Sequence, residues 1–126
     1  MAYGSALVDT IQSSTTGTPP QFNDGSGAQI GTLCRAWVNF NGVTTATIRA
    51  SFNVSSVTRT ATGNYTVNFA TAFSDANYIV TATSGGSAAR PTTSSTFTTT
   101  SALVTCSDSN TGAGYDQTYF SVAVFR

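Results

Sequence analysis

The side chains that could do chemistry in this chain are few. Its five acidic residues are all Asp, its five basic residues are all Arg, and it contains no His, Lys or Glu. Without His, nothing takes the proton from a Ser or Cys nucleophile near neutral pH, which excludes Ser-His-Asp and Cys-His arrangements. Lysine nucleophiles and bases are excluded by the absence of Lys. Hydrolysis would therefore require a pair of aspartates.

Three aspartates could in principle form such a pair, because two carboxyl groups can act as acid and base on a glycosidic bond. They are Asp75, Asp108 and Asp116. All three lie in Ser-, Asn- and Gly-rich segments of ordinary turn composition, where a carboxylate accepts hydrogen bonds from nearby backbone N–H groups. We therefore expect a protein that is not an enzyme.

Metal and cofactor sites are also not expected. Asp108, Asn110 and Asp116 could offer oxygen atoms to a hard cation, but their spacing departs from the twelve-residue calcium loop and lacks its closing Glu. Cys34 and Cys106 are too few for a zinc site of Cys and His ligands. We expect two reduced, buried thiols, with a disulfide as the alternative if their strands lie side by side.

Composition predicts one all-β domain. The chain has 126 residues, of which 40% are hydrophobic, and roughly a third are Ser or Thr. The branched Thr side chain suits a pleated, partly solvated strand better than a helix.

The charge of the chain and its lack of targeting signals exclude some classes of binding partner. Only 8% of the residues are charged and the formal net charge is zero, so the chain lacks the basic field that nucleic acid requires. Low net charge also opposes association only weakly, which favours assembly. The amino end has no basic segment followed by an apolar run, and no stretch has the length of a membrane span. We expect synthesis in a cytoplasm without export, and no membrane partner.

Alternating hydrophobicity predicts the strands that must position these side chains. Residues 29–40 and 43–54 alternate, and the Asn41-Gly42 pair between them favours a type I′ hairpin turn. The side chains expected to point into the core are Ile30, Cys34, Ala36, Val38 and Phe40 on the first strand and Ala46, Ile48, Ala50, Phe52 and Val54 on the second.

Further strands are predicted along the rest of the chain, at residues 57–60, 65–69, 78–83, 96–106 and 117–126. The turn at 61–64 should join the first two of these as a hairpin. Seven or eight antiparallel strands at this spacing predict a β-sandwich of jelly-roll type over residues 29–126. The apolar last strand should pair inside a sheet or against another subunit.

Residues 1–28 are predicted to form an extended N-terminal arm or linker with one short strand at 7–12. Pro19 and Pro20 exclude a helix or a central strand there. Two interpretations remain open, a flexible tail and an arm that lies on a neighbouring subunit.

Several motifs in order resemble a known family. They are Arg35-Ala36-Trp37-Val38-Asn39-Phe40-Asn41-Gly42, Ile48-Arg49-Ala50-Ser51-Phe52-Asn53-Val54, Gly63-Asn64-Tyr65-Thr66-Val67-Asn68-Phe69 and Asp75-Ala76-Asn77-Tyr78. Together they resemble a small β module of virion proteins from tailed bacteriophages, especially those of cyanobacteria and other aquatic hosts. The resemblance covers about residues 31–83, with a weaker match at 7–12. Such modules occur in tail fibres and other surface-exposed particle proteins.

The resemblance implies a non-enzymatic structural protein on the surface of a tailed-phage virion. It also implies a homotrimer, as in fibre and knob proteins, that contacts other capsid or tail proteins. The shortness of the chain favours a head knob, a decoration protein or a short fibre. The alternative is a receptor-binding fibre tip that recognises a host-surface glycan or protein, and a third hypothesis is a module that degrades polysaccharide.

Two groups of residues are candidates for binding. Arg35 and Trp37 lie one step apart in the strand period, so the guanidinium could cover the indole, or Trp37 could simply cover the open side of the sheet. The candidate interface comprises Arg35, Trp37, Tyr119, Val122, Val124 and Phe125. The candidate recognition loops carry Gly85, Arg90, Asp108, Asn110 and Tyr115.

Overall fold

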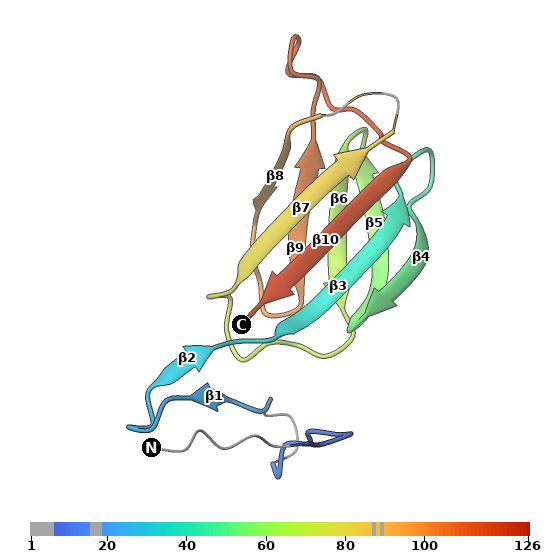
Figure 1. Cartoon of the computed structure of the whole chain (residues 1–126). Coiled ribbons are helices and arrows are strands. Elements are labelled where there is room, and N and C mark those ends of the chain that lie inside the picture. Colours follow the sequence, from blue (N-terminus) through green and yellow to red (C-terminus); the bar gives the residue numbers. More distant parts are fainter. Residues whose placement is uncertain (1–6, 16–18, 87, 89) are drawn as a thin grey trace. The chain divides into compact units, whose positions relative to one another are not determined.

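The computed structural model describes residues 7–15, 19–86, 88 and 90–126, and these form ten strands and no helix (Figure 1). The chain divides into two compact units, Met1–Leu33 and Cys34–Arg126. The division therefore falls a few residues after the boundary that the sequence predicted, at the start of the first long strand.

The second unit is an antiparallel β-sandwich, as predicted. One sheet contains, in order, β4 (Thr47–Phe52), β3 (Cys34–Asn41), β10 (Tyr119–Phe125) and β7 (Ile79–Gly85). The other contains β5 (Val54–Ala61), β6 (Asn64–Phe69), β9 (Ser101–Cys106) and β8 (Thr92–Ser95). The last strand pairs with both β3 and β7, so it lies inside a sheet and has no free edge.

The core lies between these two sheets and is built by strict alternation. Every second residue is buried in β6, β9 and β10, and in β3 from Ala36 onward. Near the start of β6, the rings of Phe40, Phe120 and Tyr65 form one aromatic group, with Phe40 and Phe120 stacked at 5.0 Å. Phe69 at the end of β6 forms a second group with Phe73 and Tyr78. The two groups close opposite ends of the sandwich.

The predicted core face of residues 43–54 is wrong over its second half. Phe52 is 55% exposed and pairs with Trp37, which also faces outward. The cause is a β-bulge: Asn39 pairs with Ala50, but Phe40 pairs with Ile48, which leaves Arg49 as an extra residue. One extra residue inverts the parity of everything beyond it, so Ile48 packs on the core while Ala50 and Phe52 point outward.

The chain then crosses to the other sheet at Asn53, which has a positive φ of 53°. The Asn53 side chain donates to the Arg35 carbonyl at 3.1 Å and accepts from the Thr71 N–H at 2.8 Å. Val54 begins β5 and packs against the core, as predicted.

The predicted two-residue turn at Asn41-Gly42 is also wrong. Asn41 is still part of β3, β4 starts at Thr47, and the positive φ in this connection belongs to Thr44. Gly42 is buried, and a Cβ built there would lie 2.5 Å from the Tyr65 hydroxyl. Glycine is therefore required here by a close approach and not by a left-handed turn.

The other connections agree with the sequence in part. The turn between β5 and β6 is a hairpin as predicted, with Gly63 at a positive φ of 73°. The strand predicted at 96–106 is confirmed only as β9, which begins at Ser101. A further strand, β8, precedes it at residues 92–95 and was not predicted, and Thr96 follows β8 with a positive φ of 51°.

The first unit is a small hairpin of β1 (Phe22–Asn23) and β2 (Gln29–Gly31). Its turn is held by Asp24, whose carboxylate accepts from the Ser26 hydroxyl at 2.7 Å and from the Ser26 and Ala28 N–H groups at 2.9 Å. The strand predicted at residues 7–12 is not present.

Both cysteines are free thiols, which agrees with the favoured prediction. Cys34 is half-buried at the start of β3, and Cys106 is buried at the end of β9. Figure 1 shows that these strand ends lie at opposite ends of the sandwich. In the described parts of the chain, no helix has the length and hydropathy needed to cross a membrane.

Candidate functional site

One polar cluster gathers around Asp116 where the connection to β10 crosses the start of β6. The Asp116 Oδ1 atom lies 2.5 Å from the Tyr65 hydroxyl and accepts from the Gly63 N–H at 2.8 Å. Arg59 in β5 donates to the same carboxylate through Nε, at 3.1 and 3.0 Å, and through Nη2, at 2.7 Å. A forked pair of this kind is strong and fixes the geometry of both partners.

The pKa values in this cluster follow from burial and bonding. Burial alone would raise the pKa of Asp116, but the bonds from Arg59, Tyr65 and the Gly63 N–H outweigh it and hold that pKa below its usual value. Burial and the hydrogen bond to Asp116 raise the pKa of Tyr65 well above its usual range. Asp116 therefore remains a carboxylate and Tyr65 a phenol at neutral pH, so neither serves as a proton carrier there.

A second cluster lies between two of the loops that the sequence predicted to be recognition loops. Arg90 forms an ion pair with Asp108, and its guanidinium carbon lies 4.1 Å from the centre of the Tyr115 ring. The other oxygen of Asp108 accepts from the N–H groups of Asn110 at 2.9 Å and Thr111 at 3.0 Å. These backbone bonds, with a smaller contribution from Arg90, lower the pKa of Asp108.

The loop that carries Asp108 is also closed by its backbone. Asp108 and Ala113 are joined by an N–H to carbonyl bond of 2.7 Å, and Ser107 bridges to Gly114. Asn110 is exposed within this loop, whereas Gly85 ends β7 and pairs with Tyr119. Of the predicted recognition residues, the structure thus brings together Arg90, Asp108 and Tyr115.

The third aspartate of the sandwich is paired as well. Asp75 forms an ion pair with Arg126 and accepts from the Asn77 N–H at 2.7 Å. Each of the three aspartates considered for catalysis is therefore bound to a different arginine. In the segments that the structure describes, no three His, Cys, Asp or Glu side chains come together as metal ligands would.

Besides these two polar clusters, the outer face of the sheet β4-β3-β10-β7 is a candidate surface for binding a ligand. It exposes Trp37 (40%), Phe52 (55%) and Tyr119 (55%), and Trp37 lines a shallow depression of about 440 Å³. Small polar side chains line this depression, among them Thr81, Thr83 and Ser121.

The six residues proposed as an interface differ in their exposure and fall into three pairs. Trp37 and Tyr119 are exposed, and Arg35 and Phe125 are half-buried. Val122 and Val124 are buried in the core, so they are not available for contact with another protein. Arg35 does not cover Trp37; its guanidinium carbon lies 5.7 Å from the centre of the Phe73 ring.

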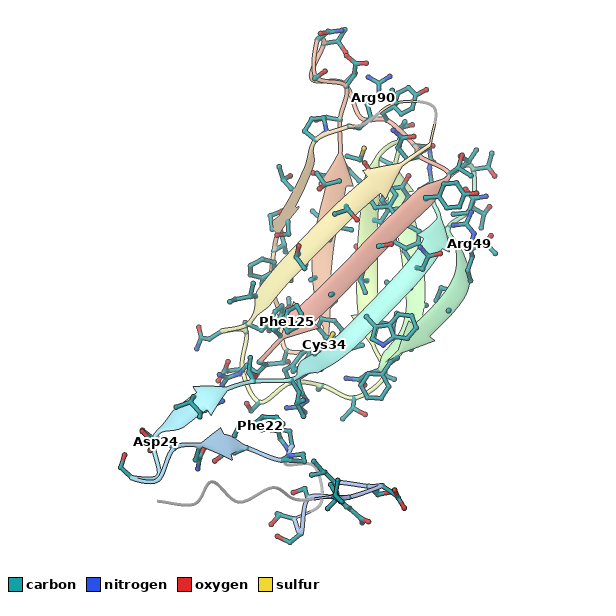
Figure 2. The ribbon with its side chains drawn as sticks, in the orientation of Figure 1. Phe22, Asp24, Cys34, Arg49, Arg90 and Phe125 are labelled. Carbon is teal, nitrogen blue, oxygen red and sulfur yellow. The ribbon has the colours of Figure 1, made fainter. Side chains whose placement is uncertain are left out.

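Arg49 is a residue of this face that the sequence did not single out. It is the extra residue of the bulge in β4, and its guanidinium carbon lies 4.6 Å from the centre of the Tyr119 ring (Figure 2). It also donates to the Thr118 carbonyl at 2.7 Å. No sequence signal marks this contact, because it depends on the bulge and on the pairing of β3 with β10.

Comparisons with known proteins give no relative: no family model, no curated protein and no solved structure matches this chain.

Proposed function

We propose that this chain is a non-enzymatic structural protein on the surface of a tailed-phage virion. In this proposal the sandwich is displayed and the first unit attaches it to copies of itself and to other capsid or tail proteins. The assembly is a homotrimer, as a head knob, a decoration protein or a short fibre. The proposal starts from the sequence resemblance.

The observation that carries the attachment role is the composition of the first unit's surface. None of its described residues, 7–15 and 19–33, is buried, and it exposes six large apolar side chains. These are Leu7, Val8, Ile11, Phe22, Ile30 and Leu33. A segment that buries none of its apolar side chains gains little hydrophobic stabilisation by itself, so a partner surface accounts for them best.

The absence of enzymatic activity is supported by the ion pairs. Asp75, Asp108 and Asp116 each bind an arginine, and lowered pKa values keep Asp108 and Asp116 ionised. A glycosidase needs a carboxyl group that stays protonated as the general acid.

The test is the mass of the assembly by light scattering at micromolar concentrations. We expect a trimer for the full chain and a smaller species when residues 1–20 are removed. A full-length monomer, or a trimer that survives this deletion unchanged, would contradict the attachment role. Release of new reducing ends from host envelope polysaccharide would contradict the non-enzymatic role.

A second candidate function is recognition of a host-surface receptor, and the loop at residues 107–115 favours it. The Asp108 bonds and the Arg90 ion pair fix this loop, while its residues 109–114 remain exposed. A fixed, exposed loop loses little conformational entropy on binding. Binding of the protein to host cells that is lost when Asn110 and Thr111 are replaced by Ala would support this function.

A further inference from the structure

Two rows of side chains cross the outer face of the sheet β4-β3-β10-β7. Strand pairing places Phe52, Trp37, Ala123 and Thr81 in one row. It places Ala50, Asn39, Ser121 and Thr83 in the next row. Because neighbouring strands are about 4.8 Å apart, the two rows together form one strip. Its one side carries the aromatic rings of Phe52 and Trp37, and its other side carries the hydroxyls of Thr81 and Thr83 on β7.

The hydroxyl side of this strip has free hydrogen-bonding capacity. Ser121 Oγ accepts from the Asn39 amide at 3.0 Å, so its own proton is available to a ligand. Among the described residues, none makes a hydrogen bond with the side-chain hydroxyls of Thr81 and Thr83. Both residues are exposed and line the depression opposite Trp37.

Charge distinguishes this face from the rest of the sandwich. All three aspartates of the second unit are paired, with Arg59, Arg90 and Arg126. In the described part of the chain, Arg35 and Arg49 have no carboxylate partner, and they belong to β3 and β4 of this sheet. No strand of the sheet carries an acidic residue.

Of these two arginines, Arg49 is the one held beside the strip. Arg49 lies beside Asn39 and Tyr119. The Arg35 guanidinium instead packs against the ring of Phe73, which belongs to the core. Pairing this face with the same face of another copy would cover Arg49 without supplying any carboxylate, which is unfavourable. The occupant that fits must therefore supply negative charge.

We propose that the outer face of the sheet β4-β3-β10-β7 binds a linear acidic polysaccharide whose sugars carry carboxylate groups. The apolar face of one sugar ring stacks on Trp37, and its hydroxyls bond to Thr81, Thr83 and Ser121. A carboxylate of a neighbouring sugar pairs with Arg49. This site is separate from the apolar residues of the first unit and does not depend on the proposed structural role.

A polysaccharide fits this surface better than the alternatives do. Its sugar rings present apolar faces and hydroxyls alternately, as the strip does, and its charges recur along an extended chain. Nucleic acid would need a denser basic field than Arg49 provides on this face. An acidic peptide would supply the charge but would leave the hydroxyl side of the strip without matching groups.

Trp37 is the only tryptophan of the chain, so its fluorescence reports on this site alone. The full-length protein is titrated with polygalacturonate, with neutral dextran and with dextran sulfate. We expect a saturable change in Trp37 emission and protection from a soluble quencher with polygalacturonate. Dextran should cause no change. Dextran sulfate should bind more weakly at equal charge, because sulfation removes the sugar hydroxyls that bond to Thr81, Thr83 and Ser121.

Substitutions then test the named contacts. Arg49→Gln and Thr83→Val should each weaken binding, by about tenfold or more for the arginine because a charged hydrogen bond is lost. Thr66→Val is the matched control for Thr83→Val, because Thr66 lies on β6 of the other sheet. It should leave the affinity within about twofold.

Four results would overturn the proposal. They are an emission that does not respond to polygalacturonate, an affinity that Arg49→Gln leaves unchanged, and dextran sulfate that binds as tightly as polygalacturonate. The fourth is an emission change that protein concentration alone produces, because it would mean that another copy occupies the face.

Discussion

The Tyr65 hydroxyl lies 2.5 Å from the carboxylate of Asp116, a residue 51 positions further along the chain. The Gly42 carbonyl is the other acceptor near this hydroxyl, at 3.0 Å, and the single phenolic proton goes to the carboxylate as the stronger acceptor. This contact ties the hairpin between β5 and β6 to the segment that enters β10. It makes the loop end of the sandwich a fixed structure.

Replacement of Tyr65 by Phe should therefore destabilise the protein with little change in packing volume. The ring stays buried against Phe40 and Phe120, but Asp116 loses a donor, and we expect a loss of about 1.5–3 kcal/mol in the free energy of unfolding. Urea denaturation measures it. Tyr119→Phe is the control, because Tyr119 is half exposed, and it should change stability by less than about 0.5 kcal/mol. Equal effects of the two substitutions would contradict the role of this bond.

Stability should fall in acid because of the same carboxylate. The pKa of Asp116 is lower in the folded protein than in the unfolded chain, where it is near 3.9. A group of this kind adds stability that is fully present above the unfolded pKa and is lost as the pH falls through the folded pKa. We expect the free energy of unfolding to be constant from pH 7 to about pH 5 and to decline below about pH 4. In Asp116→Asn this decline should be shallower. If the variant and the original protein lose stability equally in acid, the acid sensitivity belongs to other groups.

The alternation of apolar residues predicted the core face of β3 over Ala36, Val38 and Phe40, which are all buried. It failed in β4, where a single bulge at Arg49 inverts the pattern, and no residue between Ile48 and Phe52 marks the position of that bulge. The Asn41-Gly42 turn failed for a related reason. Glycine suits both a left-handed turn and a close approach, and only the position of Tyr65 decides between them.

The partners of the candidate site residues depend on which strands pair, and so they were harder to predict than the core faces. The expectation that the aspartates accept nearby backbone N–H groups is confirmed for Asp75 and Asp108. Asp116 instead binds Arg59, Gly63 and Tyr65 on two other strands and their turn. Which strands become neighbours is set by the pairing of the whole sandwich, and local sequence does not contain that information.

The bulge in β4 predicts opposite outcomes for two phenylalanines. Phe40→Ala should cost about 3–5 kcal/mol, because its ring is fully buried between Tyr65 and Phe120. Phe52→Ala should cost less than about 1 kcal/mol, because its ring lies on the outer face beside Trp37. Chemical denaturation of both variants measures the difference. A large loss for Phe52→Ala would restore the uninterrupted alternation that the sequence predicted.

Gly114 should be the least replaceable glycine of the loop at the end of β9. A Cβ at this position would lie 2.0 Å from the Thr62 carbonyl oxygen, so backbone, not a flexible side chain, would have to move. That movement would pull the loop away from the turn that presents the Gly63 N–H to Asp116. We expect Gly114→Ala to destabilise the protein by about 2–3 kcal/mol or more in thermal or chemical unfolding. Gly25→Ala is the matched control, because an added Cβ there meets nothing within 4 Å, and it should leave stability within about 0.5 kcal/mol. If Gly114→Ala is as stable as that control, the loop and the β5–β6 turn do not approach each other this closely, and the rigid loop end argued from Tyr65 and Asp116 fails with it.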